Sequence, residues 1–372
     1  MVVSLNQKDQ SPYYDKLNNA TIFYIITDNK KPKLTQMQLR GYITACLLMA
    51  TIQQSFAQTD PHFTQNYTFP MYINPAMTGG SDGEYRVSAI YRSQWGGIGN
   101  PYRTTGISFD TRTNKNISLG VNLLNQSAGD GGFNYFNTYA SIAYTGVKFG
   151  TNNEHRMVFA MQAGLINRRV DQSKFKWGEQ WNPITGYNAN NAITESFAST
   201  SATTLDMGTG VLYYDASPNK KYNVFGGLSF FHINKPKDPI ISEESVELNT
   251  IPLRYVLHGG VSINISDRAS IVPHFLFNQQ GSANETMLGT YVQLNVNEET
   301  DLMLGGYYRH KDAIAPFVGV DYKNFIFGLS YDANTSKLGN MARNINSFEL
   351  SLSYIKREGT KSIFDFIRCP RL

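Results

Sequence analysis

The six histidines are the side chains of this sequence best suited to metal binding or acid–base catalysis. No two of them have the His-Glu-x-x-His or His-x3–5-His spacing that brings imidazoles to one metal ion. His274 alternates with the apolar Pro273 and Phe275, which favours an ordinary inward-facing strand residue over a metal ligand. The sequence therefore predicts no metal site and no cofactor. The six are His62, His155, His232, His258, His274 and His310.

Signatures of covalent catalysis and of phosphate binding are missing as well. A Gly-x-Ser-x-Gly nucleophile elbow is absent, since Ser262 follows Gly260 but lacks the closing glycine. The glycine-rich run 129–132 follows an expected strand and leads into another strand, whereas a phosphate-binding loop needs a helix at that point. We interpret these glycines as hairpin or loop residues.

Carboxylates are the remaining catalytic candidates. Asp215, Asp321, Asp332 and Glu349 lie at or near polar positions of expected strands, and two carboxylates can act as general acid and base. No spacing brings these four together, so an enzyme built from them is kept only as an alternative. The expectation is a protein that is not an enzyme.

The elements that carry these residues are expected to be β-strands. From Glu84 onward, segments of about 9 to 14 residues alternate apolar and polar side chains between clusters of Gly, Asn, Asp and Ser, the pattern of strands and turns. Within 325–332 and 347–354, aromatic and aliphatic side chains share one face, and small or polar ones share the other. Fourteen such segments are centred near Val87, Ile107, Val121, Ala140, Ala160, Gly210, Leu228, Val256, Phe275, Val292, Leu304, Val318, Leu329 and Leu352.

An antiparallel transmembrane β-barrel of the outer membrane is the fold that this pattern favours. Only 17% of the 372 residues are charged, against about 25% in an average soluble domain, and no stretch after residue 58 reaches the ~20 apolar residues of a membrane helix. An even strand count, with apolar faces toward lipid and polar faces toward a wet lumen, suits such a barrel. A secreted sandwich or propeller is the alternative, but no repeat of propeller length is detectable.

Loop lengths give this barrel an orientation. Short connections such as 114–116, 217–220 and 323–324 follow even-numbered strands, whereas the long ones, roughly 171–203, 234–251 and 333–345, follow odd-numbered strands. Outer-membrane barrels keep short turns in the periplasm and long loops outside. Both ends of the chain are then expected on the periplasmic side. The net charge of +4 comes with no basic patch interleaved with aromatics, so nucleic-acid binding is not expected.

The first 57 residues are expected to be absent from the mature protein. Arg40, the apolar stretch 42–52 and Ser55-Phe56-Ala57-Gln58 form a charged region, a short apolar region and a small-x-small cleavage site, so 37–57 is interpreted as a signal peptide. Residues 1–36 are either an extension from a mis-assigned start, which the usual length of such leaders favours, or an unusually long charged region. Cys46 then lies in the leader, although 43–46 loosely resembles a lipoprotein box, and Cys369 cannot form an internal disulfide.

The mature chain is divided by these patterns into three parts: an N-terminal periplasmic or lumenal segment at 58–83, the barrel at 84–357 and a C-terminal tail at 358–372. The opening segment contains 60–65 (Asp-Pro-His-Phe-Thr-Gln) and 72–79 (Tyr-Ile-Asn-Pro-Ala-Met-Thr-Gly), and 91–95 (Tyr-Arg-Ser-Gln-Trp) follows. With these motifs the chain resembles the PorP/SprF family, outer-membrane proteins of type IX secretion and gliding in Bacteroidetes. The resemblance continues in 227–236, 254–260, 308–309, 330–332, 347–350 and 369–371. The final Leu372 departs from the aromatic residue that is common there.

The resemblance implies an outer-membrane barrel that docks, exports or retains a secreted surface protein of the adhesin or gliding type. Its implied partners are that protein, other components of the type IX machinery and membrane lipids. No catalytic residue set comes with the family. The alternative function is a passive or substrate-selective pore, because a fourteen-stranded barrel has room for a lumen unless something fills it.

Four residues are singled out for binding or blocking roles. Pro61 and Pro75 fix the path of the chain before the first strand, so this segment is expected either to fold into the lumen as a partial plug, held by Tyr72 and Asn74, or to be a rigid lead-in. Trp177 and Trp181 lie within a long outer loop, where partner contact is favoured. Trp95, at a strand end, is better explained as a membrane-interface residue.

Overall fold

The computed structural model describes residues 60–96, 100–113, 115–128, 132–191, 200–218, 220–237, 250–336 and 346–357. The predicted signal peptide at 37–57, the extension at 1–36 and the tail at 358–372 lie outside these residues. Among the described residues, no helix has the length and apolarity needed to cross a membrane.

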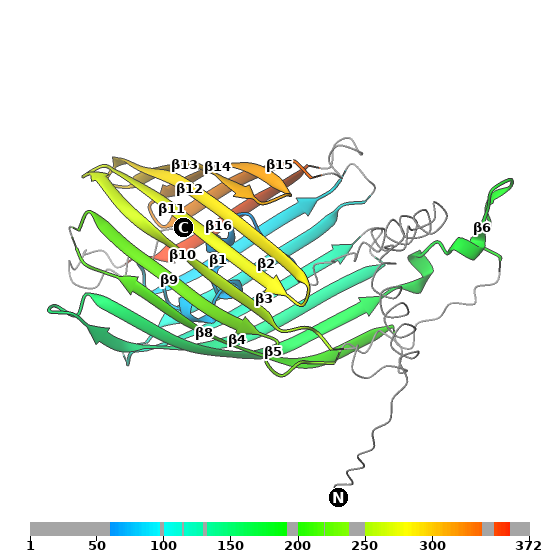
Figure 1. Cartoon of the computed structure of the whole chain (residues 1–372), viewed down its shortest axis with the longest axis horizontal. Helices are drawn as coiled ribbons and strands as arrows, with labels where there is room; N and C mark the ends of the chain where they lie inside the picture. The colour runs from blue at the N-terminus through cyan, green and yellow to red at the C-terminus, as the bar shows by residue number, and fades with distance from the viewer. Residues whose placement is uncertain are drawn as a thin grey trace, which may run out of the picture. The chain divides into compact units, whose positions relative to one another are not determined.

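Fourteen antiparallel strands close into one barrel (Figure 1). Each expected segment centre falls within one of them, which confirms the predicted fold. In chain order the strands are β1 (Tyr85–Gln94), β2 (Tyr102–Arg112), β3 (Ile117–Ala128), β4 (Phe133–Phe149), β5 (His155–Val170), β8 (Ser201–Asp215), β9 (Tyr222–Phe231), β10 (Arg254–Ser266), β11 (Ala269–Gln280), β12 (Ala283–Asn297), β13 (Thr300–Arg309), β14 (Ala313–Tyr322), β15 (Phe325–Asn334) and β16 (Ser347–Lys356). β1 pairs with β16 and closes the ring.

Alternation along each strand separates a lipid face from an interior face. In β15 and β16, Phe327 is 50% exposed and Leu350 is 48% exposed, whereas Ser330 and Ser353 are buried. Successive side chains of a strand point to opposite faces, so a period-two sequence produces an apolar outer band around the closed sheet. That band suits the hydrocarbon region of a membrane.

The connections divide the barrel into two ends. All turns after even-numbered barrel strands are short, as at 267–268, 298–299 and 323–324, and we call this the short-turn end. The opposite, long-loop end carries the connections 171–200, 232–253 and 335–346, although 281–282 and 310–312 there are also short. By the rule for outer-membrane barrels, the short-turn end faces the periplasm.

The segment that precedes β1 lies inside the barrel. It contains three short 3-10 helices, η1 (Asn66–Thr68), η2 (Pro70–Tyr72) and η3 (Pro75–Met77), all of whose residues are buried. Proline stands at the first position of two of them, where its fixed φ suits a helical turn and its missing N–H is not needed. The Asn74 side chain caps η3 by accepting a hydrogen bond from the Ala76 N–H at 2.9 Å.

The interior is packed rather than wet, which corrects the expectation of a water-filled lumen. Alternation does place polar side chains inward, but the N-terminal segment covers them and adds apolar residues of its own. The larger buried cluster combines Tyr67, Ile73, Ala76 and Met77 of this segment with strand residues such as Leu212, Tyr214, Phe225, Val256, Met287, Tyr291, Met303, Tyr307 and Phe317.

The direction of this segment corrects a second expectation. Asp60 contacts Gln280 at the end of β11 and His232 just after β9, both at the long-loop end. Gly79 contacts Asp110 and Arg112 near the end of β2, at the short-turn end. The described part of the chain therefore starts near the long-loop end and runs through the lumen to the short-turn end before β1 begins, whereas a start at the periplasmic, short-turn end was expected.

Candidate functional site

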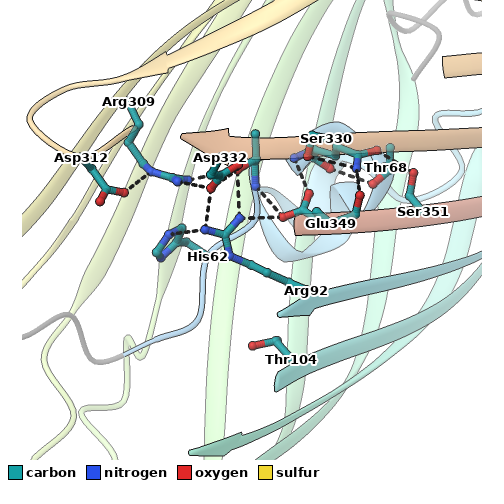
Figure 2. Close-up of polar contacts among 12 residues, drawn as sticks. His62, Thr68, Arg92, Thr104, Arg309, Asp312, Ser330, Asp332, Glu349 and Ser351 are labelled. Carbon is teal, nitrogen blue, oxygen red and sulfur yellow. Dashed lines mark hydrogen bonds and ion pairs between the residues drawn. The ribbon is translucent and has the colours of Figure 1, made fainter. Parts of the chain in front are cut away.

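A cluster of buried charges attaches the start of the N-terminal segment to the strands that close the barrel (Figure 2). Arg92 of β1 forms ion pairs with Glu349 of β16 at 2.9 Å and with Asp332 of β15 at 2.8 Å. Glu349 also accepts hydrogen bonds from the backbone N–H groups of Thr64, at 2.9 Å, and Gln65, at 2.6 Å. Arg309 of β13 adds a second guanidinium to Asp332.

Burial decides how strongly this cluster constrains the molecule. The side chains of Arg92, Asp332 and Glu349 are at most 3% exposed. A buried charge that loses its partner is strongly destabilising, by about 3–5 kcal/mol, so each member requires the others. Since Arg92 and Glu349 are also directly opposite in the β1–β16 register, the cluster joins the closure of the barrel to the position of the segment.

A second buried cluster surrounds Asp60. His232 lies between two carboxylates, with Nε2 2.9 Å from Asp60 and Nδ1 2.9 Å from Asp206 of β8. Burial lowers the pKa of His232, but the two carboxylates outweigh it and raise that pKa to about 9. Burial likewise raises the pKa of Asp60, yet His232 and Arg254 hold it well below its ordinary value. The imidazolium and the carboxylate therefore stabilise each other at neutral pH.

His62 lies between the two clusters as a neutral side chain. Burial, together with the nearby Arg309 and Arg92, holds its pKa well below the ordinary histidine value. Its Nε2 is 3.4 Å from an Arg92 nitrogen, and because guanidinium nitrogens only donate, that Nε2 accepts. His62 is thus an additional hydrogen-bond acceptor for the first cluster (Figure 2).

Both residues expected to hold a plug lie inside the barrel. Asn74 is 0% exposed, and its Nδ2 donates to the Val211 carbonyl at 3.0 Å and lies 3.1 Å from His258 Nε2. Tyr72 is 6% exposed. Its hydroxyl donates to the Pro61 carbonyl at 2.7 Å, and the Arg254 guanidinium lies 4.6 Å from its ring centre.

Glycines on the inner wall make room for this segment. A Cβ on Gly210 of β8 would lie 2.0 Å from Asn74 Oδ1, and one on Gly227 of β9 would lie 2.5 Å from Asn74 Nδ2. A Cβ on Gly328 of β15 would lie 2.2 Å from Gln65 Oε1. These positions therefore accept the segment only because they carry no side chain. Sequence reasoning missed them, since a glycine within a strand pattern does not identify what approaches it.

The histidines and carboxylates weighed for chemistry are distributed without a shared centre. His274 Nδ1 lies 3.0 Å from the Val272 carbonyl and therefore donates to it, and its ring packs on Tyr67 and Tyr307. Among the described residues, no group of three or more His, Cys, Asp or Glu is arranged to hold a metal ion.

The four candidate carboxylates separate into two groups. Asp332 and Glu349 share Arg92 near the long-loop end. Asp215 pairs with Lys220 at 3.1 Å, and Asp321 pairs with Arg357 at 2.8 Å, both at the short-turn end. For Asp332 and Glu349, the signal that could have identified the cation partners was the presence of Arg92 and Arg309 at inward-facing strand positions.

The two tryptophans of the long loop differ in exposure. Trp181 is 62% exposed and opens the two-residue strand β6 (Trp181–Asn182), which pairs with β7 (Gly186–Tyr187). Trp177 is partly buried, and its ring lies 6.0 Å from that of Phe175. At the tip of the hairpin Ile184 is 94% exposed. The hairpin thus presents apolar side chains to solvent, whereas Trp177 packs within the loop.

These features define a transmembrane β-barrel of the outer membrane whose lumen is filled by the segment that precedes its first strand. The chain belongs to the PorP/SprF family: the family model for the type IX secretion system membrane protein PorP/SprF matches residues 55–354. The family predicted from the opening motifs is therefore confirmed. A comparison with curated protein sequences gave no match.

Three solved structures show a weak similarity to this chain, each with a TM-score below 0.5. The toluene transporter TbuX of Ralstonia pickettii is 12% identical with a TM-score of 0.46, over 77% of this chain and 92% of its own. The toluene transporter TodX of P. putida is 9% identical with a TM-score of 0.46, over 77% and 92%. A FadL homologue of Pseudomonas aeruginosa is 10% identical with a TM-score of 0.38, over 76% and 92%. Nothing about transport by this chain follows from these likenesses.

Proposed function

We propose that this protein is a closed docking barrel of the type IX secretion system, which supports the export or retention of a secreted surface protein of the adhesin or gliding type. Membership of the PorP/SprF family supports the secretion role. The observation that carries the closed, non-catalytic form of that role is the filled lumen. A conducting pore needs a continuous aqueous path, whereas here residues 63–78 occupy the interior and are buried.

The energetics of the segment support a permanently closed barrel. Phe63, Tyr67, Phe69 and Tyr72 are each at most 6% exposed. Full burial of a large apolar side chain stabilises by roughly 1.5–3 kcal/mol. If the segment left, His232 would also lose Asp60, and Glu349 would lose the hydrogen bonds from the N–H groups of Thr64 and Gln65. Tyr72 and Asn74, predicted as plug residues, lie in the middle of this buried segment, which supports the proposal that it serves as a plug.

Planar-bilayer conductance tests the closed barrel. The purified full chain is expected to show no steady open-channel current. A variant with residues 66–78 replaced by a Gly-Ser linker of equal length, if it retains the strand content of the native protein by circular dichroism, is expected to conduct. Steady current through the native chain would instead support the alternative, a passive or selective pore.

The secreted partner is proposed to dock on the β6–β7 hairpin. Exposed aromatic and aliphatic residues on a preformed element are favourable binding residues, because their apolar surface is already presented and little order is lost on contact. Gln180 holds the base of the hairpin, as its side chain donates to the Ala189 carbonyl at 3.2 Å and its carbonyl accepts from the Asn188 N–H at 2.8 Å. These two hydrogen bonds fix the base from which the tip projects.

The partner assay compares the tip with the base of this loop. Replacing Trp181, Ile184 and Tyr187 together by Ser should abolish co-purification of a surface protein after mild detergent extraction and should lower its display on cells. A matched variant, Lys311→Ser in the β13–β14 turn at the same end, should retain both. Unchanged display in the triple variant would exclude the hairpin as the docking site.

A further inference from the structure

Two basic side chains at the short-turn end face each other without an acidic partner. Lys148 of β4 and Arg156 of β5 are directly opposite in the strand register, an arrangement in which like charges destabilise a sheet. Within the part of the chain that the structure describes, neither forms an ion pair or a side-chain hydrogen bond, and the buried Nε of Arg156 has no partner. The fold thus keeps an electrostatic cost that nothing in the described protein offsets.

Several other charges at the same end are neutralised. Lys323 pairs with Glu299 at 3.5 Å, and Lys356 pairs with Glu84 at 3.0 Å. Asp321, which lies opposite Asp301 in the β13–β14 register, pairs with Arg357. A like-charge acidic pair at this end is therefore compensated, whereas the basic pair is not.

The two faces of the β4–β5 end indicate which kind of anion fits. A bulge between Tyr144 and Val147 shifts the register, so that Lys148 and Arg156 share the inward face with Tyr214, which is 3% exposed. The outward face carries the rings of Phe149 and His155, stacked 5.3 Å apart. Aromatic rings in this position suit the membrane interface. A lipid phosphate on the outward face would therefore contact these rings, because the basic pair lies on the inward face.

We propose that Lys148 and Arg156 bind the carboxylates of an acidic segment in a periplasmic protein of the secretion machinery. This inference rests on the proposed function, because it assigns a second partner to the opposite end of the same barrel. A guanidinium presents paired donors that match a carboxylate, and an ammonium adds a point charge beside it. A bound carboxylate would offset the repulsion between the two cations. Occupation of the site would therefore relieve the electrostatic cost that the empty pair carries.

A zero-length carbodiimide cross-link tests the site in outer membranes of the native host. The reagent joins a lysine amine to a carboxylate already in contact with it. Lys148 is expected to be linked to an aspartate or glutamate of a second polypeptide, which mass spectrometry of the linked peptide identifies. The Lys323–Glu299 and Lys356–Glu84 pairs provide internal links that report folding and reaction in the same sample.

Variants separate the site from general charge effects. Arg156→Gln should lower the Lys148 link by roughly tenfold, the loss of one charged hydrogen-bond donor, while Arg268→Gln, in a turn at the same end, should leave it unchanged. Absence of a Lys148 link while the internal links form, equal loss in both variants, or an anionic lipid that co-purifies with the native chain and is lost with Arg156→Gln would each overturn the proposal. Export of the surface protein, measured in parallel, distinguishes the two proposals. If export requires the barrel but no Lys148 link forms, only this inference is contradicted. If export does not require the barrel, the proposed function is contradicted.

Discussion

At the scale of single residues, the Asp60–His232 pair is where acidity and structure are most directly linked. His232 also has a positive φ of 59°, a backbone conformation that a non-glycine residue adopts at a cost. Tertiary contacts must compensate for that cost, and the two carboxylates that flank the ring supply them. The pair is therefore both the anchor of the segment and its pH-sensitive part.

Stability is expected to fall as the pH rises from about 6.5 to above 9. The pKa of His232 is raised to about 9 from the ordinary value of 6.5, so its contribution is fully present below 6.5 and is lost as the pH passes through 9. The loss is on the order of 3 kcal/mol. Asp60, with a lowered pKa, contributes above its ordinary value of 3.8 and does not change in this window.

The measurement is the thermal unfolding temperature of the protein in detergent between pH 6 and 10. The His232→Gln variant should be less stable than the native protein at pH 6. Its unfolding temperature should fall much less between pH 6.5 and 9. A control variant, His310→Gln in the β13–β14 turn, should show the same decline of unfolding temperature as the native protein. An equal decline in native protein and His232→Gln would place the titration elsewhere.

Arg92 is expected to be the residue of the first cluster least tolerant of substitution. Arg92→Met leaves Glu349 buried without its guanidinium and should destabilise the barrel by about 3–5 kcal/mol in urea unfolding. Replacing both partners, as Arg92→Met with Glu349→Leu, should recover part of this loss, because no unpaired charge remains. If the double variant were less stable than the single one, the hydrogen bonds of Glu349 to Thr64 and Gln65 would outweigh its charge.

At the scale of elements, glycines on the inner faces of β8 and β9 leave the space that the N-terminal segment occupies. Gly227→Val should displace Asn74, because the new Cβ would lie 2.5 Å from Asn74 Nδ2 and 2.5 Å from His258 Nε2. Its neighbour Gly226 faces outward, and a Cβ there would meet nothing closer than 3.5 Å. Overpacking of this kind typically costs about 1–3 kcal/mol.

The pair of variants Gly227→Val and Gly226→Val gives a controlled comparison within one strand. The first should make residues 60–78 accessible to protease in detergent while the strands stay protected, and the second should not. Equal protection of the segment from protease in both variants would mean that Asn74 can move aside while the segment stays in the lumen.

The strands were predictable from the sequence, and the contents of the barrel were not. Alternation and turn residues located all fourteen strands because both are local. The Arg92–Glu349 pair joins residues 257 positions apart, and only closure of the ring brings them together. Asp332 and Glu349 were recognisable as inward carboxylates, but their partners depended on a segment whose path no local pattern fixes. The roles of Trp177 and Trp181 stay predictions.

At the scale of the whole molecule, the path of the segment sets the sidedness of the chain. An epitope inserted directly before Asp60 should be recognised by antibody on intact cells, because Asp60 contacts side chains at the long-loop end. An epitope inserted after Arg357, which contacts the Lys323 carbonyl at the short-turn end, should be recognised only after the outer membrane is opened. The reverse labelling pattern would mean that the barrel has the opposite orientation in the membrane.

The lumenal segment also dictates an order of assembly. Residues 60–78 are made before any strand, yet Gln65 donates to the Glu349 carbonyl and accepts from Ser351, both on the last strand. Once β1 and β16 have joined, the ring offers no lateral way in. We therefore expect the first part of the polypeptide to lie against the open sheet before the last strand arrives, so that the joining of β16 completes both the wall and its contents.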